Sequence, residues 1–344
     1  MREPGAGVLV LGAGDWGRNL IRNFHDLEAL SGICEINPKL LEEARATYPE
    51  VPVWESLDQA LAERNYEALA IATPAVTHYA LARQALEAGF PVFLEKPMAM
   101  SSEESRHLVE LSRRRGRTLM VGHLPLFMPA IEELKDVLKA RTLGEILYLQ
   151  ARRVNLGRVR KHENVLWSLA PHDVAVFLYL LGEMPTEVHC FGQAWLQPGI
   201  EDLVFLELRF PGNRIAAAQF SWLDPGLERR LTVVGRKGMA VVDELNPHNR
   251  LRITDRRFDP VKGLTVSGTD RFPQLASEQP LARECRHFLH CVRTGKRPRS
   301  GGTLGHQVVQ VLEAATKSLH DGGTWKVLEE NNLDRRLSTT ACRP

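Results

Sequence analysis

A glycine-rich turn near the start of the chain is the first group of residues whose spacing points to chemistry. Gly12, Gly14 and Gly17 are spaced as G-x-G-x-x-G, directly after an apolar run and at the start of a helical pattern. Such glycines allow a tight turn, and backbone N–H groups at the N-terminus of the following helix can bind pyrophosphate oxygens. We therefore expect a dinucleotide site, with these contact residues: Gly12, Gly14, Asp15, Trp16 and Gly17. The alternative is a turn with only a structural role.

An acidic residue after the next apolar run bears on which dinucleotide binds. Glu35 lies 18 residues beyond Gly17, directly after Ile33-Cys34. Its carboxylate can accept hydrogen bonds from the adenosine ribose and would repel a 2′-phosphate. No arginine stands among residues 36–38, so the sequence favours NAD over NADP. The alternative is that Glu35 is a surface glutamate.

Lys96 is a candidate for proton transfer beside the redox centre. The sequence Glu95-Lys96-Pro97 follows the apolar run Val92–Leu94, and open parallel sheets bind ligands beyond the carboxyl ends of their strands. Pro97 restricts Lys96 to extended backbone conformations. Burial and a cationic nicotinamide would both lower the pKa of Lys96 towards a useful value. From spacing alone, a solvated surface lysine is the alternative.

The elements that must position these residues change in type along the chain. Over residues 1–122, short apolar runs alternate with helical patterns, which predicts a parallel sheet covered on both faces. Beyond Gly122, helices predicted over Pro129–Lys139 and His172–Leu181 precede runs of period two at 204–210 and 216–222, which predict antiparallel strands. Two late helices are predicted near Glu278–Arg293 and Gly305–His320. We therefore expect an α/β domain (1–122), an α+β domain (123–332) and a loose tail (333–344).

Composition excludes several classes of protein. Among 344 residues, 44 basic and 42 acidic side chains leave a net charge of +2, unlike the strong basic excess of proteins that coat nucleic acid. No apolar run approaches the ~20 residues that span a bilayer. The five cysteines show no Cys-x-x-Cys spacing, so we expect neither a disulfide framework nor a bound metal. Because Met1–Gly5 shows no signal-peptide pattern, we expect a cytoplasmic protein.

Four motifs in order along the chain resemble the Gfo/Idh/MocA oxidoreductase family. They are Gly12–Gly17, Ala72-Thr73-Pro74, Glu95-Lys96-Pro97 and Pro171-His172-Asp173, and the resemblance spans nearly the whole chain. It implies an NAD-binding Rossmann domain followed by an α+β domain with a large, mostly antiparallel sheet. In the family the exposed face of this sheet commonly forms dimers or tetramers, so a homodimer or homotetramer is expected.

The resemblance also implies roles for individual residues. Lys96 and His172 match the family's catalytic lysine and histidine, and four further residues are expected near the cofactor: Thr73, Pro74, His78 and Glu95. We expect His172 just before a helix, whose N-terminus would keep the imidazole neutral and able to accept a proton. The alternative is a histidine hydrogen-bonded in the seam between the domains.

One position departs from the family pattern. Many members carry an aspartate four residues before the histidine, where this chain has Ser168. Without that carboxylate, we expect Lys96 and His172 to carry the chemistry between them.

Positive charges gather just before the predicted His172 helix. Five lie within ten residues: Arg152, Arg153, Arg158, Arg160 and Lys161. Arginine forks match phosphate oxygens, so part of this run is expected to hold a diphosphate; a solvated charged loop is the alternative. Residues 152–182 are similar to family members of nucleotide-sugar metabolism. The predicted substrate contacts are His123, Arg152, Asn155, Arg158, Asn164 and Trp167, with a packed hinge residue as the alternative for His123.

The sequence thus predicts an NAD-dependent oxidoreductase acting on a secondary alcohol of a sugar or nucleotide sugar. A UDP-N-acetylhexosamine oxidised at C3 is one such substrate. The alternatives are an inositol or free-sugar dehydrogenase, an NAD-dependent glycosidase in which the oxidation is transient, and a nucleotide-sensing regulator without catalysis. Lys96 and His172 together argue against the regulator, whereas Ser168 keeps it open.

Overall fold

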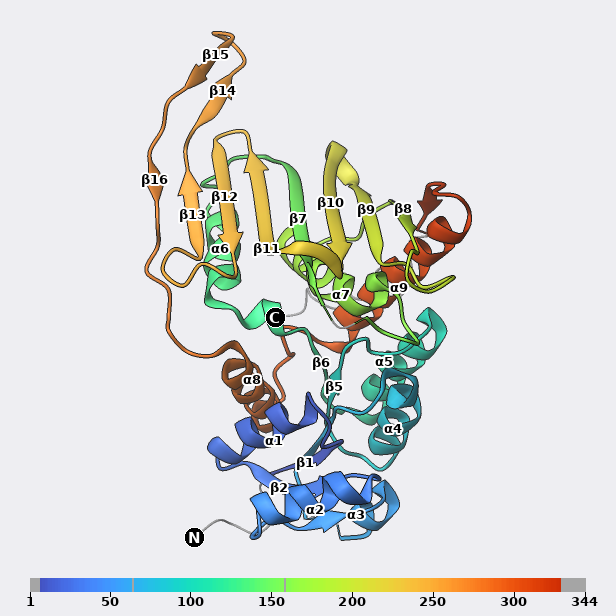
Figure 1. Cartoon of the computed structure of the whole chain (residues 1–344). Coiled ribbons are helices and arrows are strands. Elements are labelled where there is room, and N and C mark those ends of the chain that lie inside the picture. Colours follow the sequence, from blue (N-terminus) through green and yellow to red (C-terminus); the bar gives the residue numbers. More distant parts are fainter. Residues whose placement is uncertain (1–6, 64, 158, 329–344) are drawn as a thin grey trace.

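Parallel strands near the start of the chain form the sheet that carries the glycine turn (Figure 1). The structure, a computed structural model, describes residues 7–328 except 64 and 158. Within these residues the sheet has six strands in the order β3-β2-β1-β4-β5-β6. They are β1 (Val8–Leu11), β2 (Leu30–Cys34), β3 (Val53–Trp54), β4 (Ala68–Ile71), β5 (Val92–Glu95) and β6 (Leu119–Gly122). Every residue of β1, β4 and β5 is buried, as a sheet covered on both faces requires.

Helices connect these strands and begin where the sequence supplies caps. They are α1 (Gly17–Asp26), α2 (Pro38–Thr47), α3 (Leu57–Glu63), α4 (Ala75–Glu87) and α5 (Ser102–Arg115). The Asn37 side chain accepts hydrogen bonds from the first N–H groups of α2, and Ser101 does the same for α5. Helices α1 and α4 differ, because no side chain caps their N-termini at Trp16 and Pro74. The predicted alternation of strand and helix is confirmed.

A second, larger sheet lies beyond the first one (Figure 1). In the described part of the chain it has nine strands in the order β16-β13-β12-β11-β7-β10-β9-β8-β17. They are β7 (Ile146–Leu156), β8 (Glu187–Gln193), β9 (Leu203–Phe210), β10 (Arg214–Ser221), β11 (Leu223–Gly235), β12 (Gly238–Asp243), β13 (Leu251–Thr254), β16 (Asp270–Arg271) and β17 (Lys326–Val327). The pairs are antiparallel except β7 with β10, so the predicted mostly antiparallel sheet is confirmed. The strands β14 (Arg257–Asp259) and β15 (Leu264–Val266) form a separate hairpin that projects from the body.

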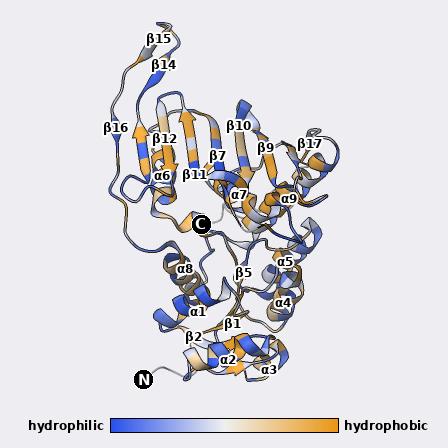
Figure 2. Cartoon of the chain, in the orientation of Figure 1, coloured by the Kyte–Doolittle hydropathy of each residue, from blue (hydrophilic) through white to orange (hydrophobic). Residues whose placement is uncertain are grey.

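Helices cover one face of the larger sheet. They include α6 (Pro129–Lys139), α7 (Val165–Leu181) and α9 (Gly302–His320), and α8 (Pro280–Thr294) lies nearer the first sheet. Short 3-10 helices, η1 (Leu124–Phe127) and η2 (Pro211–Asn213), complete the chain. Hydrophobic residues concentrate on the strands and on the helices between the sheets (Figure 2). No helix of the described residues is long and apolar enough to cross a membrane.

The start of α7 corrects one prediction. The helix does not begin at His172 but seven residues earlier, at Val165, with Asn164 accepting a hydrogen bond from the Trp167 N–H. Pro171 lies inside the helix. Proline has no N–H to donate to the carbonyl of Trp167, one turn back. The expected neutralising effect of a helix N-terminus on His172 is therefore wrong.

The late helices fasten the two sheets together. On α8, Phe288 packs edge to face on Phe93 of β5, with ring centroids 5.7 Å apart. On α9, His306 is hydrogen-bonded to Ser105 of α5 at 2.8 Å. Residues far along the chain thus complete the core of the first sheet.

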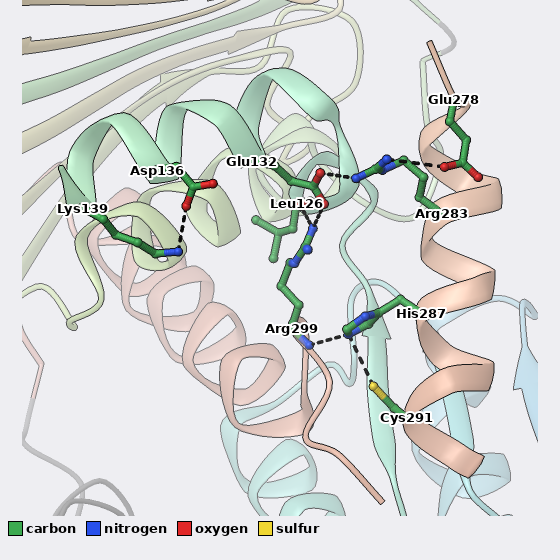
Figure 3. Close-up of polar contacts among 9 residues, drawn as sticks. All are labelled: Leu126, Glu132, Asp136, Lys139, Glu278, Arg283, His287, Cys291 and Arg299. Atoms are coloured by element: carbon green, nitrogen blue, oxygen red, sulfur yellow. Dashed lines mark hydrogen bonds and ion pairs between the residues drawn. The ribbon is translucent and has the colours of Figure 1, made fainter. Parts of the chain in front are cut away.

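A polar network joins α6, α8 and the segment before α9 (Figure 3). Glu132 of α6 forms ion pairs with Arg283 of α8 and with Arg299. The Arg299 backbone N–H donates to Nε2 of His287 at 3.0 Å, and its guanidinium donates to the Leu126 carbonyl at 2.7 Å. The network fixes the path of the chain between α8 and α9.

Candidate active site

A cavity of about 760 Å³ lies between the carboxyl ends of the first sheet and α7. Its lining comes from the glycine turn, from the ends of β4, β5 and β6, from the segment before α7, and from α7 itself. Lining residues are Trp16, Ala72, Thr73, Pro74, Ala75, Val76, Glu95, Lys96, Pro97, Met100, Gly122, Leu124, Val159, Arg160, Lys161, His162, Glu163 and His172. The structure therefore brings the predicted pair, Lys96 and His172, to one cavity.

The glycine turn has the geometry of a pyrophosphate cradle. Gly12 has a φ of +94°, and a Cβ there would lie 2.8 Å from the Ala72 carbonyl oxygen. A Cβ on Gly17 would lie 2.0 Å from the Gly12 carbonyl oxygen, whereas one on Gly14 would meet nothing within 4 Å. Close packing thus requires two of the glycines, and open space lies over the third. With α1 uncapped by a side chain, the turn fits the phosphates of a dinucleotide.

Glu35 is held against this turn. It lies at the end of β2, where Oε2 accepts the Ala13 N–H at 2.6 Å and Oε1 accepts the Asn37 N–H at 2.8 Å. The residue is only 9% exposed. Two backbone donors leave further lone pairs on the carboxylate for ribose hydroxyls.

Thr73, Pro74 and His78 follow β4 at the same edge of the sheet. Thr73 and Pro74 line the cavity. His78 is buried beneath them, with its ring nitrogens 2.7 Å from the Pro97 carbonyl oxygen and 2.9 Å from that of Thr73. Its ring therefore links the two segments that border the cavity.

Glu95 and Lys96 end β5 and are both directed into the site. Glu95 accepts hydrogen bonds from Trp16 Nε1 at 2.5 Å and from the Lys96 N–H at 3.2 Å, and burial raises its pKa to about 7. Lys96 Nζ donates to the Ser168 carbonyl of α7 at 3.0 Å. Burial lowers the pKa of Lys96, and the carboxylates of Glu95 and Glu163 oppose that effect.

His172 reaches the cavity from the middle of α7. Burial lowers its pKa well below the usual value, and the positive charges of Lys96 and Arg153 lower it further. Among the described residues its Nδ1 has no hydrogen-bond partner. Burial and the neighbouring positive charges thus favour the neutral imidazole, and no helix N-terminus is involved.

A buried ion cluster supports α7 from behind. Arg153 of β7 donates to Asp173 at 2.6 and 3.2 Å, and to Glu244 at 2.7 Å. The Asp173 carboxylate is thus paired with Arg153. The cluster fixes the helix that carries His172.

Several predicted substrate contacts lie outside the cavity lining. Arg152 faces away from α7, since side chains alternate along β7, and it pairs with Asp224 and Glu228. Asn164 caps α7 and donates to Glu201, and the Trp167 indole donates to Thr316 of α9 at 2.9 Å.

His123 and Asn155 are also not among the lining residues. His123 is buried, neither ring nitrogen has a partner among the described residues, and burial lowers its pKa to about 3. Asn155 is half-buried on β7, and Arg158 lies outside the described residues.

The sequence did not predict that the whole 159–163 segment lines the cavity. Arg160 and Lys161 belong to the basic run, part of which was expected to hold a diphosphate, but neither was named as a substrate contact. His162 and Glu163 were not predicted at the site. The segment is anchored by Gln197, whose Nε2 donates to the Arg160 carbonyl at 2.8 Å. Its density of charge just before the capping Asn164 was the available signal. Among the described residues, no cluster of His, Cys, Asp and Glu could hold a metal ion.

Known proteins resemble this chain over nearly its whole length. The UDP-N-acetylglucosamine 3-dehydrogenase of Acidithiobacillus ferrooxidans is 28% identical, covering 87% of this chain and 93% of its own. Its solved structure superposes with a TM-score of 0.81 at 25% identity, covering 91% of this chain and 97% of that one. The 2,7-anhydro-N-acetylneuraminate hydratase of Escherichia coli is 27% identical, covering 93% of this chain and 96% of its own.

Two family models match successive parts of the chain. The model of an oxidoreductase family with an NAD-binding Rossmann fold matches residues 6–123. The GFO/IDH/MocA C-terminal domain matches residues 131–241. These matches agree with the parallel sheet, the glycine cradle and the large mixed sheet. The chain belongs to the Gfo/Idh/MocA family of NAD(P)-binding oxidoreductases.

Proposed function

We propose that this protein is an NAD-dependent dehydrogenase that acts on a secondary alcohol of a nucleotide sugar. The observation that carries the proposal is the convergence of Lys96 and His172 on the cavity beside the glycine turn. The two residues are 76 positions apart; Lys96 directly follows β5, and His172 belongs to α7. Oxidation of an alcohol requires a group that accepts the hydroxyl proton beside the dinucleotide site, and Lys96 and His172 are two such groups.

Lys96 and His172 act as the proton acceptors in this proposal. Burial lowers both pKa values, so the Lys96 ammonium loses its proton more readily than a solvated lysine, and each group in its neutral form can accept the hydroxyl proton. The bound cofactor supplies the hydride acceptor at its nicotinamide ring. Proton transfer of this kind contributes about 10²–10⁴-fold to the rate, and fixed geometry of the reacting carbon supplies much of the remainder.

Glu35 supports NAD as the cofactor. Its carboxylate is held by two backbone donors at the end of β2, where it would accept the hydroxyls of the adenosine ribose. A 2′-phosphate would meet this negative charge.

Arg160, Lys161 and His162 support an anionic substrate. They line the cavity from the segment before α7, and Arg160 Nε lies 3.5 Å from Glu163 Oε1. A diphosphate would bind this group of donors better than an uncharged inositol would. The name of the Acidithiobacillus relative is in keeping with a UDP-linked substrate.

We also propose a homodimer or homotetramer that covers the open face of the larger sheet. Tyr148, Phe191 and Ile215 expose 42%, 45% and 46% of their surface on strands whose alternate residues are buried under the helices. Apolar groups gathered on one face are typical of an interface. A solution mass of one chain, measured by light scattering, would contradict the proposal.

The function is tested by following NADH absorbance with a panel of UDP-sugars, free sugars and inositols. We expect NADH with a UDP-sugar, and we expect Arg160→Ala and Lys161→Ala to raise KM more than they lower kcat. Release of an aglycone without net NADH would favour the glycosidase instead. Binding of ligand without either signal would favour the regulator.

A further inference from the structure

A second carboxyl group lies behind the active site and has no role in the chemistry described so far. Glu284 of α8 has no exposed surface, and neither of its oxygens has a hydrogen-bond partner among the described residues. Buried polar groups in native proteins are nearly always paired. An unpaired buried carboxyl therefore calls for an explanation from its surroundings.

The packing of α8 on β5 places this carboxyl opposite Glu95. Phe93 contacts Phe288, and Glu95 is two residues beyond Phe93, on the same face of β5. Glu284 is four residues before Phe288, on the same face of α8. The two offsets are of similar length, about 7 Å along the strand and about 6 Å along the helix, and the carboxyls are close enough that the charge of Glu95 raises the pKa of Glu284.

The two carboxyls have very different partners. Glu95 accepts hydrogen bonds from Trp16 Nε1 and the Lys96 N–H, and its carboxylate packs on Gly122, where a Cβ would lie 2.8 Å from Oε1. Glu284 accepts none from the described residues. Donors stabilise a carboxylate, so Glu95 is the member that ionises and Glu284 the member that keeps its proton.

The other groups near the pair leave this assignment unchanged. Lys96 brings a positive charge that favours ionised Glu95. The Cys285 thiol, beside Glu284, stays protonated because burial and both carboxyls raise its pKa. His123, which follows Gly122, is neutral because burial lowers its pKa. Double ionisation of the pair is opposed, since the charge of Glu95 raises the already high pKa of Glu284.

We propose that Glu95, with Glu284 fixed beside it as a neutral acid, is a charge sensor that distinguishes the oxidised from the reduced cofactor. The inference rests on the proposed function, because it needs the nicotinamide end of NAD in this cavity. Oxidised nicotinamide is cationic and stabilises ionised Glu95, so its binding expels one proton to solvent. Reduced nicotinamide is neutral and leaves that proton in place. The pair thus favours NAD⁺ over NADH increasingly as pH rises.

The test is cofactor binding without substrate, measured by calorimetry in two buffers with different heats of ionisation. Near pH 7 about half of the Glu95 side chains carry a proton, because burial raises the pKa to about 7, so we expect NAD⁺ binding to release up to about half a proton per site and NADH binding to release none. The Kd for NAD⁺ should fall about tenfold from about pH 6 to about pH 8, while that for NADH stays constant within about twofold. Equal pH dependence for both cofactors would overturn the proposal.

Matched variants separate the two carboxyls and the neighbouring amine. Glu95→Gln should abolish the pH dependence for NAD⁺, whereas Glu284→Gln, the same change on the group that stays neutral, should retain it. Lys96→Met should also retain it, with the midpoint at higher pH because the ammonium no longer favours ionised Glu95. Persistence in Glu95→Gln, or loss in Lys96→Met, would refute the assignment. A wild-type protein that binds neither cofactor would instead refute the proposed function.

Discussion

At the scale of single residues, the proposal depends most on Lys96. Lys96→Ala removes the amine that donates to the Ser168 carbonyl, but it leaves the glycine turn and Glu35 intact. We expect kcat to fall about 10²–10⁴-fold, the usual contribution of a proton-transfer group, with NAD⁺ binding retained. Stopped turnover together with calorimetric NAD⁺ binding would support this role. Turnover like that of the wild type would remove Lys96 from the mechanism.

Ser168 gives a second prediction at this scale. Its carbonyl lies 3.0 Å from Lys96 Nζ, so Ser168→Asp adds a carboxylate close to the amine. A nearby negative charge favours the ammonium form and raises the pKa of Lys96. Because the neutral amine accepts the proton, the rise of kcat/KM with pH should move to higher pH, and activity near neutral pH should fall. Ser168→Ala, which adds no charge, should leave the pH profile in place.

The sequence predicted the place of a site residue where the strand directly before it decides that place. It did not predict the place of a residue whose partners lie far along the chain. Gly12 and Lys96 owe their places to the strands directly before them, so their spacing was enough. Arg152 pairs with Asp224 and Glu228, which join it only when β11 pairs with β7. The run of positive charges in the sequence therefore could not show that Arg152 lies outside the cavity.

At the scale of elements, α7 carries His172, and the anchoring of the first turn of α7 helps to fix the position of that side chain in the cavity. Asn164 accepts a hydrogen bond from the Trp167 N–H and donates one to Glu201, so Asn164→Ala removes both the helix cap and the hydrogen bond to Glu201. We expect a loss of about 1 kcal/mol in the free energy of unfolding, measured with urea, and a higher KM for the sugar. Ser101→Ala removes the comparable cap of α5 and should cost similar stability without that rise in KM. An equal rise in both variants would contradict a specific role for the start of α7.

The position of that start was the least predictable feature of the element. The sequence predicted a helix over His172–Leu181, directly after Pro171. The observed start is decided by Asn164, whose side chain supplies the first acceptor, and by the apolar contacts of Val165 and Leu166 in the core. The cap and the tertiary burial thus place the start of α7 seven residues before the predicted one.

At the scale of the whole molecule, sequence order and spatial order differ. The chain leaves the first sheet at β6, builds the larger sheet, and returns with α8 and α9 to cover β5 and α5. The alternating pattern of the first 122 residues predicted the strands of the first sheet. It did not indicate that α8 and α9 complete the core around that sheet. A pattern of periodicity describes which face of an element is apolar, and it does not name the partner that covers that face.

The return of α8 means that the first sheet should not be stable without the end of the described chain. Phe288→Ala removes a fully buried ring of α8 that packs against Phe93 of β5. Such a change typically lowers the free energy of unfolding by about 3–5 kcal/mol. We expect faster amide hydrogen exchange in β5 and α1, at the opposite end of the sequence, and partial recovery on adding NAD⁺. Phe220→Ala removes a fully buried ring from β10 and should instead speed exchange in the larger sheet. Unchanged exchange in β5 of Phe288→Ala would show that the first sheet holds its core alone, and the link between α8 and the cofactor site would then fail.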